Sequence, residues 1–217
     1  MTESAQVEMN AFYKKYKAFR KNITHYQPVV NTNLIPLVNT LANHKDKVAC
    51  FKGCSWCCHY RVVARTHEIV AIYTYINTKI TRNVREQIKA EILETASIID
   101  GISDKEHEQT NIKCPMLQAG KCAIYEVRPS KCAGYCSTSD SDCEQLFNLT
   151  KTMAGSVILD IELQRQNQDD KMDAVLDYEG HDKQQYELVT SLAALFDQPQ
   201  LISRWRKNGK PIFTRLG

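Results

Sequence analysis

The sequence predicts a mostly α fold, a helical bundle that carries two irregular, cysteine-rich, metal-binding loops. Apolar residues recur at helical spacing in several long segments, which is the pattern of amphipathic helices. Series of alternating apolar and polar runs, which would indicate strands, are absent. All nine cysteines of the 217-residue chain fall in two stretches broken by Gly, Pro, Ser and Asp, where irregular structure is expected.

Two helices are expected before the first cysteine. Residues 3–24 form the first, because their apolar side chains repeat at helical spacing: Val7, Phe12, Tyr16, Phe19 and Ile23. A second helix opens at Pro28. We expect Pro36 to kink or shorten it, because proline lacks the backbone N–H that a helix interior requires.

The segment between the two cysteine stretches is also predicted to be mainly helical. After a short extended segment at residues 60–64, helices are expected over residues 66–80 and 84–99, with Gly101 as a stop. The polar residues 101–113 are expected to form a loop.

Two more helices are expected at and after the last cysteine. The string Ser141-Asp142-Cys143-Glu144 is a capping-box pattern. The apolar residues behind it predict one long helix: Leu146, Leu149, Met153, Val157, Ile158 and Ile161. A polar gap at residues 164–173 separates it from a last helix near residues 182–196. The basic tail, residues 201–217, is expected to hold a short strand or to pack loosely.

Length and composition fit one globular domain over residues 1–217. We expect a cysteine-cluster core at residues 50–143, flanked by helices within residues 1–45 and 144–217. Hydrophobic residues make up 43% of the chain and charged residues 24%, as in ordinary soluble proteins. The net charge of +3 falls well short of the basic excess of nucleic-acid-binding domains, so no nucleic-acid partner is expected.

The expected compartment decides how the cysteines are interpreted. No apolar stretch approaches the roughly 18 residues of a membrane span, and residues 1–20 lack the continuous apolar region of a secretory signal. We therefore expect no membrane partner and a cytoplasmic location, where thiols stay reduced. Metal ligation is then favoured over disulfides and over unliganded thiols. A disulfide between the adjacent Cys57 and Cys58 would also be strained.

The first cysteine loop, residues 50–58, holds four thiols: Cys50, Cys54, Cys57 and Cys58. The second cysteine loop, residues 114–143, offers Cys114, Cys122, Cys132 and Cys136, with Cys143 as the alternative to Cys136. Thiolates that converge from short loops are typical ligands of zinc and of iron–sulfur clusters. Eight or nine thiolates are more than one tetrahedral site needs. Two arrangements therefore stay possible: two sites of four cysteines each, or one polynuclear centre.

One spacing in the first loop resembles that of another class of protein. Cys50-x-x-x-Cys54-x-Trp56-Cys57 is similar to the three-cysteine signature of radical S-adenosylmethionine enzymes. In that class three thiolates hold a [4Fe–4S] cluster and leave one iron open to the cosubstrate. Those enzymes place the motif after the first strand of a barrel, and this sequence shows no series of strand–helix units.

The second loop carries the more specific resemblance. It contains Cys114-Pro115-Met116-Leu117 and then Cys122-Ala123-Ile124-Tyr125-Glu126-Val127-Arg128-Pro129-Ser130-Lys131-Cys132. Together with the first loop, this string resembles the bacterial CxxCxxCC cysteine-cluster family, a zinc- or iron-chelating domain. The resemblance covers residues 50–143. The chain is also similar, more distantly, to flagellin lysine N-methylase. One departure is the spacing of three residues, rather than two, between Cys50 and Cys54.

The resemblance implies eight metal ligands, the seven thiols Cys50, Cys54, Cys57, Cys58, Cys114, Cys122 and Cys132 plus either Cys136 or Cys143. Around them, Arg128 and Tyr125 are candidate cofactor-contacting residues. Arg128 could donate to a cluster sulfur or an anionic cosubstrate, or it could pair with a carboxylate. Tyr125 could shield a cluster or be an ordinary core aromatic. His59 and His67 are reserve ligands, because imidazole also binds these metals.

The leading functional prediction is a metal-binding cysteine-cluster protein that coordinates zinc or an iron–sulfur centre, with the metal ion or cluster as its partner. This prediction rests on the nine cysteines, whose soft thiolates select zinc or iron–sulfur over magnesium or calcium. One alternative is a protein lysine methyltransferase that uses S-adenosylmethionine at a [4Fe–4S] cluster and acts on a protein substrate. A second alternative is a metal chaperone or redox sensor.

Overall fold

The computed structural model describes residues 3–51, 53–148 and 156–216. Over these residues the predicted mostly α fold is confirmed. The α-helices are α1 Glu3–Lys21, α2 Gln27–Ala42, α3 Thr66–Lys79, α4 Arg82–Asp100, α5 Asp104–Gln109, α6 Ser130–Gly134, α7 Asp140–Asn148, α8 Leu159–Tyr178, α9 Leu188–Asp197 and α10 Gln200–Asn208. The short 3-10 helices are η1 Ile23–His25, η2 Lys45–Lys47, η3 Trp56–His59 and η4 Tyr125–Val127. The strands are β1 Val63–Arg65, β2 Leu117–Gln118, β3 Lys121–Cys122 and β4 Gln185–Glu187.

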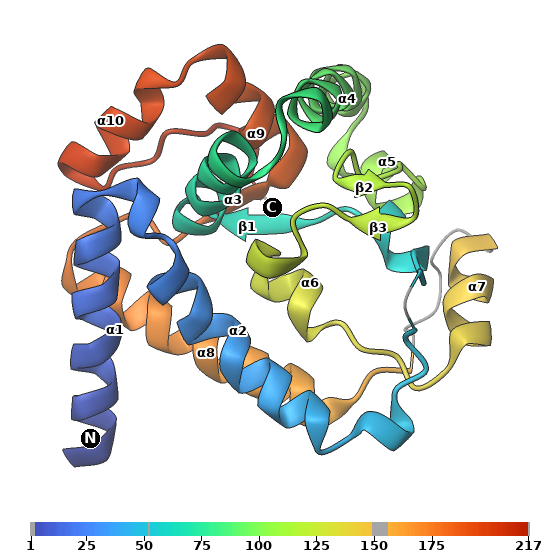
Figure 1. Ribbon diagram of the computed structural model, residues 1–217, viewed down its shortest axis with the longest axis horizontal. Helices are drawn as coiled ribbons and strands as arrows, with labels where there is room; N and C mark the ends of the chain where they lie inside the picture. Colours follow the sequence, from blue (N-terminus) through green and yellow to red (C-terminus); the bar gives the residue numbers. More distant parts are fainter. Residues whose placement is uncertain (1–2, 52, 149–155, 217) are drawn as a thin grey trace.

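The helices form two groups with α6 between them (Figure 1). In the first group α1 and α2 pack against α8, and in the second α4 and α3 pack against α9, which also contacts α10. α7 lies at the far end of the molecule from α1 and packs against η3. In the described part of the chain, no helix combines the length and the apolar character of a membrane span.

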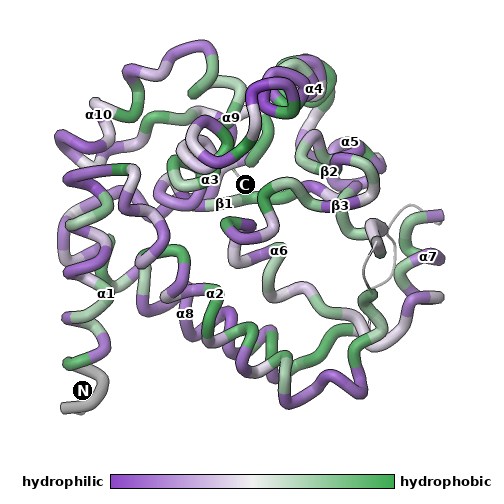
Figure 2. Tube along the Cα trace, viewed as in Figure 1, coloured by the Kyte–Doolittle hydropathy of each residue, from purple (hydrophilic) through white to green (hydrophobic). Residues whose placement is uncertain are grey.

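One hydrophobic core joins the two helix groups. Tyr16 and Phe19 of α1 are fully buried, and their rings lie against Trp205 of α10. Ile88 and Ile92 of α4 are equally buried within the same core. Hydrophobic and hydrophilic residues alternate along helices such as α2 and α4 in Figure 2, as the periodicity predicts. We call this assembly of α1–α4 and α8–α10 the helical body.

A second, smaller core lies between α2, α6 and α8. Its buried members are Leu37, Ala133, Cys136, Ile158 and Ile161. It connects the second cysteine loop to the helical body by ordinary apolar packing.

The extended segment predicted at residues 60–64 lies slightly later, as β1. It pairs antiparallel with β4, with Ala64 opposite Tyr186, and each strand runs directly into a helix. The other two strands form a separate hairpin within the second cysteine loop. In the described ranges no barrel forms.

The helices predicted before and between the cysteine loops are confirmed. α1 ends at Lys21, α3 and α4 fill the ranges expected for them, and the backbone N–H of Gly101 caps α4 by donating to the carbonyl of Ile98. Pro36 does not shorten its helix, because α2 continues to Ala42. The prediction of a loop over residues 101–113 is wrong in part. Ser103 and Glu106 form a reciprocal capping box that starts the short helix α5.

The single long helix predicted after the last cysteine is wrong. The Ser139 hydroxyl accepts the N–H of Asp142 at 3.1 Å, so α7 begins before the predicted capping box. α7 ends at Asn148, and the predicted apolar positions Leu149 and Met153 lie outside the described residues. Val157 pairs with Ser137 in an isolated β-bridge instead of continuing a helix.

The predicted polar gap at residues 164–173 is also wrong, because these residues form the middle of α8. Two of its charged side chains, Arg165 and Asp169, are buried and pair with each other. Arg65, at the start of α3, pairs with Asp169 at 3.2 Å and binds Asp173 through two nitrogens at 2.6 and 2.8 Å. Polar residues inside α8 therefore face a buried ion network rather than solvent.

The last predicted helix starts later than expected, since residues 185–187 form β4 before α9 begins at Leu188. The tail does not pack loosely, because residues 200–208 form the helix α10 and bury Trp205 to 1% exposure. Beyond α10 the chain stays extended, and Leu216 forms a β-bridge with Tyr186.

Candidate metal centre

The two cysteine loops are joined through their backbones. The N–H of Cys114 donates to the carbonyl of Cys58 at 2.8 Å, and the N–H of Ala49 donates to the carbonyl of Ser137 at 2.9 Å. The indole N–H of Trp56 adds a bond to Asp140 at 3.1 Å. Two segments far apart in the sequence are thereby held side by side, with their thiols between them.

A glycine turn shapes the start of the first loop. Gly53 has a φ of 98°, a conformation that side chains rarely adopt, and the N–H of Cys54 closes the turn by donating to the carbonyl of Phe51 at 3.0 Å. The 3-10 helix η3 then carries Cys57 and Cys58. The three-residue spacing between Cys50 and Cys54 is therefore the spacing of a tight turn.

A two-residue hairpin places Cys122 in the second loop. Ala119 and Gly120 both have positive φ, 49° and 72°, as a type I′ turn requires. The turn pairs Leu117 with Cys122, and the N–H of Leu117 donates to the carbonyl of Cys114 at 2.9 Å. The hairpin thus brings Cys122 back to the neighbourhood of Cys114.

The helix α6 carries Cys132 and is fixed by the buried ion network. The N–H of Ser130 donates to Glu68 Oε1 at 2.8 Å, and the other oxygen of Glu68 accepts the N–H of Arg65 at 2.9 Å. At the other end of α6, Gly134 lies so close to Arg165 that an added Cβ would be 2.5 Å from its Cδ. These contacts leave α6 little freedom to shift.

Four thiols form one group, which we call the first thiol group: Cys58, Cys114, Cys122 and Cys132. Every pair within it interacts electrostatically. Burial raises the pKa of Cys114 to about 12, and the neighbouring Cys122 and Cys58 raise it as well. Crowding by the surrounding protein raises the pKa of Cys132 well above its ordinary value, and Cys114, Cys122 and Cys58 raise it further, although the residue is exposed on one side of α6. Four thiols, from η3, the segment before the hairpin, the hairpin and α6, are therefore neighbours.

The second thiol group contains Cys50, Cys54, Cys57 and Cys143. Burial raises the pKa of Cys54, and Cys50 and Cys143 both interact with it. Cys57 interacts with Cys132 of the first group as well as with Cys50. Tyr60 and Tyr135 lie beside this group, with their rings 6.4 Å apart. Burial raises the pKa of Tyr135, and Cys143, Cys57 and Cys50 raise it further.

Cys57 and Cys58 connect the two groups. The interaction between their side chains raises the pKa of Cys57 and lowers that of Cys58. One proton of the pair is therefore lost easily, and the second is held because two adjacent thiolates repel each other. A cation bound near both sulfurs would favour the doubly deprotonated state.

The ninth thiol, Cys136, lies in a different environment. It is buried in the small core between α2, α6 and α8, and its sulfur donates to the carbonyl of Ala133 at 4.0 Å. Burial raises its pKa to about 11, and Cys50 is the thiol that interacts with it. Its contacts are those of an apolar core residue.

Arg128 and Tyr125, the predicted cofactor-contacting residues, stack on each other. The Cζ of Arg128 lies 3.7 Å from the centroid of the Tyr125 ring, and Tyr125 is 62% exposed, so it is not a core aromatic. Burial raises the pKa of Cys122 and of Cys132, and the Arg128 guanidinium opposes both shifts. The Arg128 guanidinium thus interacts electrostatically with the first thiol group, and its stacking on Tyr125 fixes its position.

The two reserve histidines occupy different places. His59 lies at the thiol loops, where its Nδ1 is 3.1 Å from the carbonyl of Ser55 and its ring packs edge-on against Phe147. His67 is buried to 4% exposure, and the pKa of its ring responds to burial, Arg65, Asp169 and Asp173. His67 therefore belongs to the surroundings of the buried ion network.

All nine cysteines are free thiols in the structure. Over the described residues, no three Cys, His, Asp or Glu side chains are already arranged as ligands of one metal ion. The donor chemistry nevertheless fits zinc or iron–sulfur, since free thiols gather where the two loops meet.

Sequence reasoning missed several residues around the thiols. Tyr60 and Tyr135, which lie beside the second thiol group, each adjoin a cysteine segment, and that position was the available signal. Asp140, the partner of Trp56, gave no signal, because its contact depends on how the two loops meet.

Comparisons with known proteins agree with this geometry. Residues 49–153 match the family model of the CxxCxxCC domain, described as a putative zinc- or iron-chelating domain. No match was found among curated proteins or among solved structures. The distant resemblance to flagellin lysine N-methylase therefore stays a prediction.

Proposed function

Because residues 49–153 belong to the CxxCxxCC family of chelating domains, we propose that the chain holds metal in two adjacent four-thiolate centres. The observation that carries this proposal is that thiols from both cysteine loops gather where the loops meet, in two groups of four that adjoin at Cys57 and Cys58. A four-coordinate centre requires four thiolates that approach one point from different directions. Backbone hydrogen bonds between the two loops favour such a centre, because they hold the thiols of both loops near one another.

The first centre uses Cys58, Cys114, Cys122 and Cys132. Each of these ligands comes from a segment that other contacts already fix: η3, the residue before the hairpin, the hairpin and α6. Such preorganisation lowers the entropy cost of ligation. The Arg128 guanidinium offsets part of the negative charge that four thiolates would concentrate there.

The second centre uses Cys50, Cys54 and Cys57 with Cys143 as its fourth ligand. Cys143 interacts with Cys54 and lies on α7, which packs against η3. The hydroxyl of Tyr60 donates to the carbonyl of Cys143 at 3.5 Å, which ties α7 to the first loop. Cys136 instead packs in an apolar core, and we assign it no metal.

Of the two metals, we place iron–sulfur ahead of zinc. Cys57 and Cys58 are consecutive, so the two centres adjoin, and eight thiolates gathered this closely suit polynuclear chemistry. In either case the metal links residues far apart in the sequence and stabilises the arrangement of the loops. We assign no enzymatic activity, because no contact of the described residues favours one.

Metal and acid-labile sulfide analysis of anaerobically purified protein tests the identity of the centres. Iron with an equal amount of sulfide, together with visible absorption, supports iron–sulfur. About two zinc per chain without sulfide supports two tetrahedral zinc centres. A protein that retains neither metal after anaerobic purification and reconstitution would overturn the proposal.

Single-cysteine variants test the assignment of ligands. We expect Cys58→Ser and Cys143→Ser each to remove about half of the bound metal, because each removes one ligand of a different four-thiolate centre. Cys136→Ser is the matched control, a cysteine of the same loop that should keep the full metal content. Equal losses from Cys136→Ser and Cys143→Ser would show that the second centre is wrongly assigned.

A further inference from the structure

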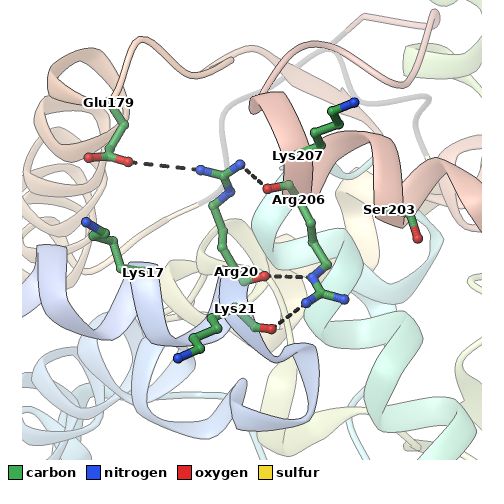
Figure 3. A pocket seen from close by; sticks show the side chains of 7 residues that line it. All are labelled: Lys17, Arg20, Lys21, Glu179, Ser203, Arg206 and Lys207. Carbon is green, nitrogen blue, oxygen red and sulfur yellow. Dashed lines mark hydrogen bonds and ion pairs between the residues drawn. The ribbon is translucent and has the colours of Figure 1, made fainter.

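A basic pocket lies on the helical body, between α1 and α10. It has a volume of about 460 Å³. Its lining residues are Lys17, Arg20, Lys21, Glu179, Ser203, Arg206 and Lys207. Figure 3 shows α1 and α10 contributing the cations from two sides, with Glu179 at the edge. Five cationic side chains and one carboxylate thus share a single concave surface.

The two arginines are engaged in holding the helices together. Arg20 Nη2 donates to the carbonyl of Trp205 at 3.1 Å and to that of Arg206. Arg206 returns the contact, because its Nε donates to the carbonyl of Arg20 at 2.7 Å and its Nη2 donates to that of Lys21. Each arginine caps the last turn of the other helix, and the dashed lines in Figure 3 mark the bonds of Arg20 to Arg206 and of Arg206 to Arg20 and Lys21.

The lysines, by contrast, keep most of their binding capacity. Lys17 donates to the hydroxyl of Tyr13 at 3.1 Å, whereas Lys21 and Lys207 form no ion pair with any described residue. The single carboxylate, Glu179, lies 4.0 Å from Arg20 Nη1. The pocket therefore carries a local excess of positive charge that an anion would relieve.

We propose that this pocket binds a small oligophosphate anion, such as the phosphate chain of a nucleotide or inorganic tripolyphosphate. Ammonium groups act as compact point charges that bind phosphate, and the Ser203 hydroxyl adds a neutral donor. Both guanidinium groups already bind backbone carbonyls, so the three ammonium groups are the cations that remain to bind an anion.

The size and the lining of the pocket restrict the kind of ligand further. The volume falls within the ~300–1,000 Å³ of typical small-molecule sites, more than one orthophosphate fills. None of the lining residues is aromatic, so the pocket offers no platform on which a nucleobase could stack. The site should therefore recognise the phosphate chain and ignore the nucleoside.

Isothermal titration of the metal-loaded full chain with tripolyphosphate, ATP and orthophosphate tests the proposal. We expect tripolyphosphate and ATP to bind with similar affinity and orthophosphate more weakly, and we expect added salt to weaken all three. Metal content is measured before and after each titration, because oligophosphates chelate cations.

Charge-reversal variants locate the binding. Lys21→Glu and Lys207→Glu should each weaken tripolyphosphate binding about tenfold, because each removes an attraction and adds a repulsion. Lys105→Glu on the distant helix α5 is the matched control, since it changes the net charge equally from an exposed position. Circular dichroism confirms that all variants are folded.

Four outcomes would overturn the proposal. They are a lack of tripolyphosphate binding, an equal loss in Lys105→Glu, binding of ATP without binding of tripolyphosphate, and tighter lysine-dependent binding of single-stranded RNA. None of them bears on the metal centres, because no lining residue of the pocket belongs to a thiol group.

Discussion

The helical body and the cysteine loops are stabilised in different ways. In the helical body, Ile88 and Ile92 of α4 and Leu192 and Leu195 of α9 are all fully buried. Burial of one such side chain stabilises a fold by roughly 1.5–3 kcal/mol. In the loops, Cys50 is exposed and Cys54, Cys57 and Cys58 are half-buried. The body therefore folds through apolar burial, whereas the first cysteine loop depends on hydrogen bonds and on what its thiols bind. The second loop lies between these cases, because Met116, Ile124 and Val127 are buried in the main core.

α6 is where the two regions meet. Ala133 packs in the small core with Leu37 and Ile161, while Ser130 is bound to Glu68 of the ion network. Cys132, between these two anchors, belongs to the first thiol group. The helical body thus fixes one ligand of the loops directly.

Removal of the metal should produce the largest difference between the two regions. We expect a chelator under reducing conditions to abolish the hydrogen-exchange protection of residues 53–60, because none of them is buried in a hydrophobic core. Residues 114–143 should keep part of their protection, since Met116, Ile124 and Val127 are buried in the main core. Protection in α4 and α9 should stay nearly unchanged. Hydrogen-exchange mass spectrometry measures both regions in one sample.

A core substitution provides the converse control. Ile92→Ala should lower the free energy of unfolding by about 2–5 kcal/mol without changing the metal content. Equal loss of protection in both regions after chelation would show that they form one cooperative unit.

Acid should destabilise the helical body through His67. Burial lowers the pKa of His67 to about 3, and Arg65 lowers it too, against the opposite effect of Asp169 and Asp173. Between pH 6.5 and 3 the unfolded chain therefore binds the extra proton, so stability falls as the pH falls through this window. The loss attributable to His67 reaches up to roughly 5 kcal/mol.

The His67→Leu variant isolates this contribution. Unfolding by denaturant at pH 7 and pH 4 should show a smaller acid loss in the variant than in the parent chain, since the titrating carboxylates and thiols are common to both. Identical pH dependences of the two proteins would contradict the assignment.

Substitution of Gly134 should affect both regions moderately. An added Cβ would lie 2.5 Å from Arg165 Cδ, so Gly134→Ala must shift α6 or Arg165. We expect a loss of about 1–3 kcal/mol in unfolding free energy, together with weaker metal binding through Cys132. Gly101→Ala is the control, because its Cβ would make only ordinary contacts. Unchanged metal affinity in a destabilised Gly134→Ala protein would show that α6 does not position Cys132.

The smallest effect is expected at Tyr125. Loss of its stacking on Arg128 in Tyr125→Leu should reduce stability by about 0.5–1 kcal/mol, the range of exposed cation–π contacts, and leave the metal content unchanged. Thermal denaturation and metal analysis measure the two quantities. A loss of metal would instead give Tyr125 the cofactor-contacting role that the sequence suggested.

Prediction from sequence was accurate where one physical signal decided the structure. α1 and α4 have clear apolar stripes, and both were located within a few residues. The middle of α8 was missed because Arg165 and Asp169 look like surface residues until Arg65, a hundred residues away, is placed beside them. α10 was missed although Leu201, Ile202 and Trp205 share one face of it, because the segment is short and its many basic residues were interpreted as a tail.

The same limit applies to the candidate site. Spacing and motif identified the cysteines as candidate ligands, since their density can be seen in the sequence alone. The grouping of Cys58 with Cys114 depends on a backbone hydrogen bond between distant segments. The different surroundings of Cys136 and Cys143 likewise appear only once α2, α7 and α8 are packed.

The order of the packed elements has a consequence for biosynthesis. β1 pairs with β4, α2 packs on α8, and α4 packs on α9, so the helical body is completed by segments that follow both cysteine loops. Translation produces all nine thiols before any of those late helices leaves the ribosome. During synthesis there is therefore an interval in which the cysteines are not yet covered by the helices that later pack around them. That interval is when they are most accessible to metal donors and to oxidants.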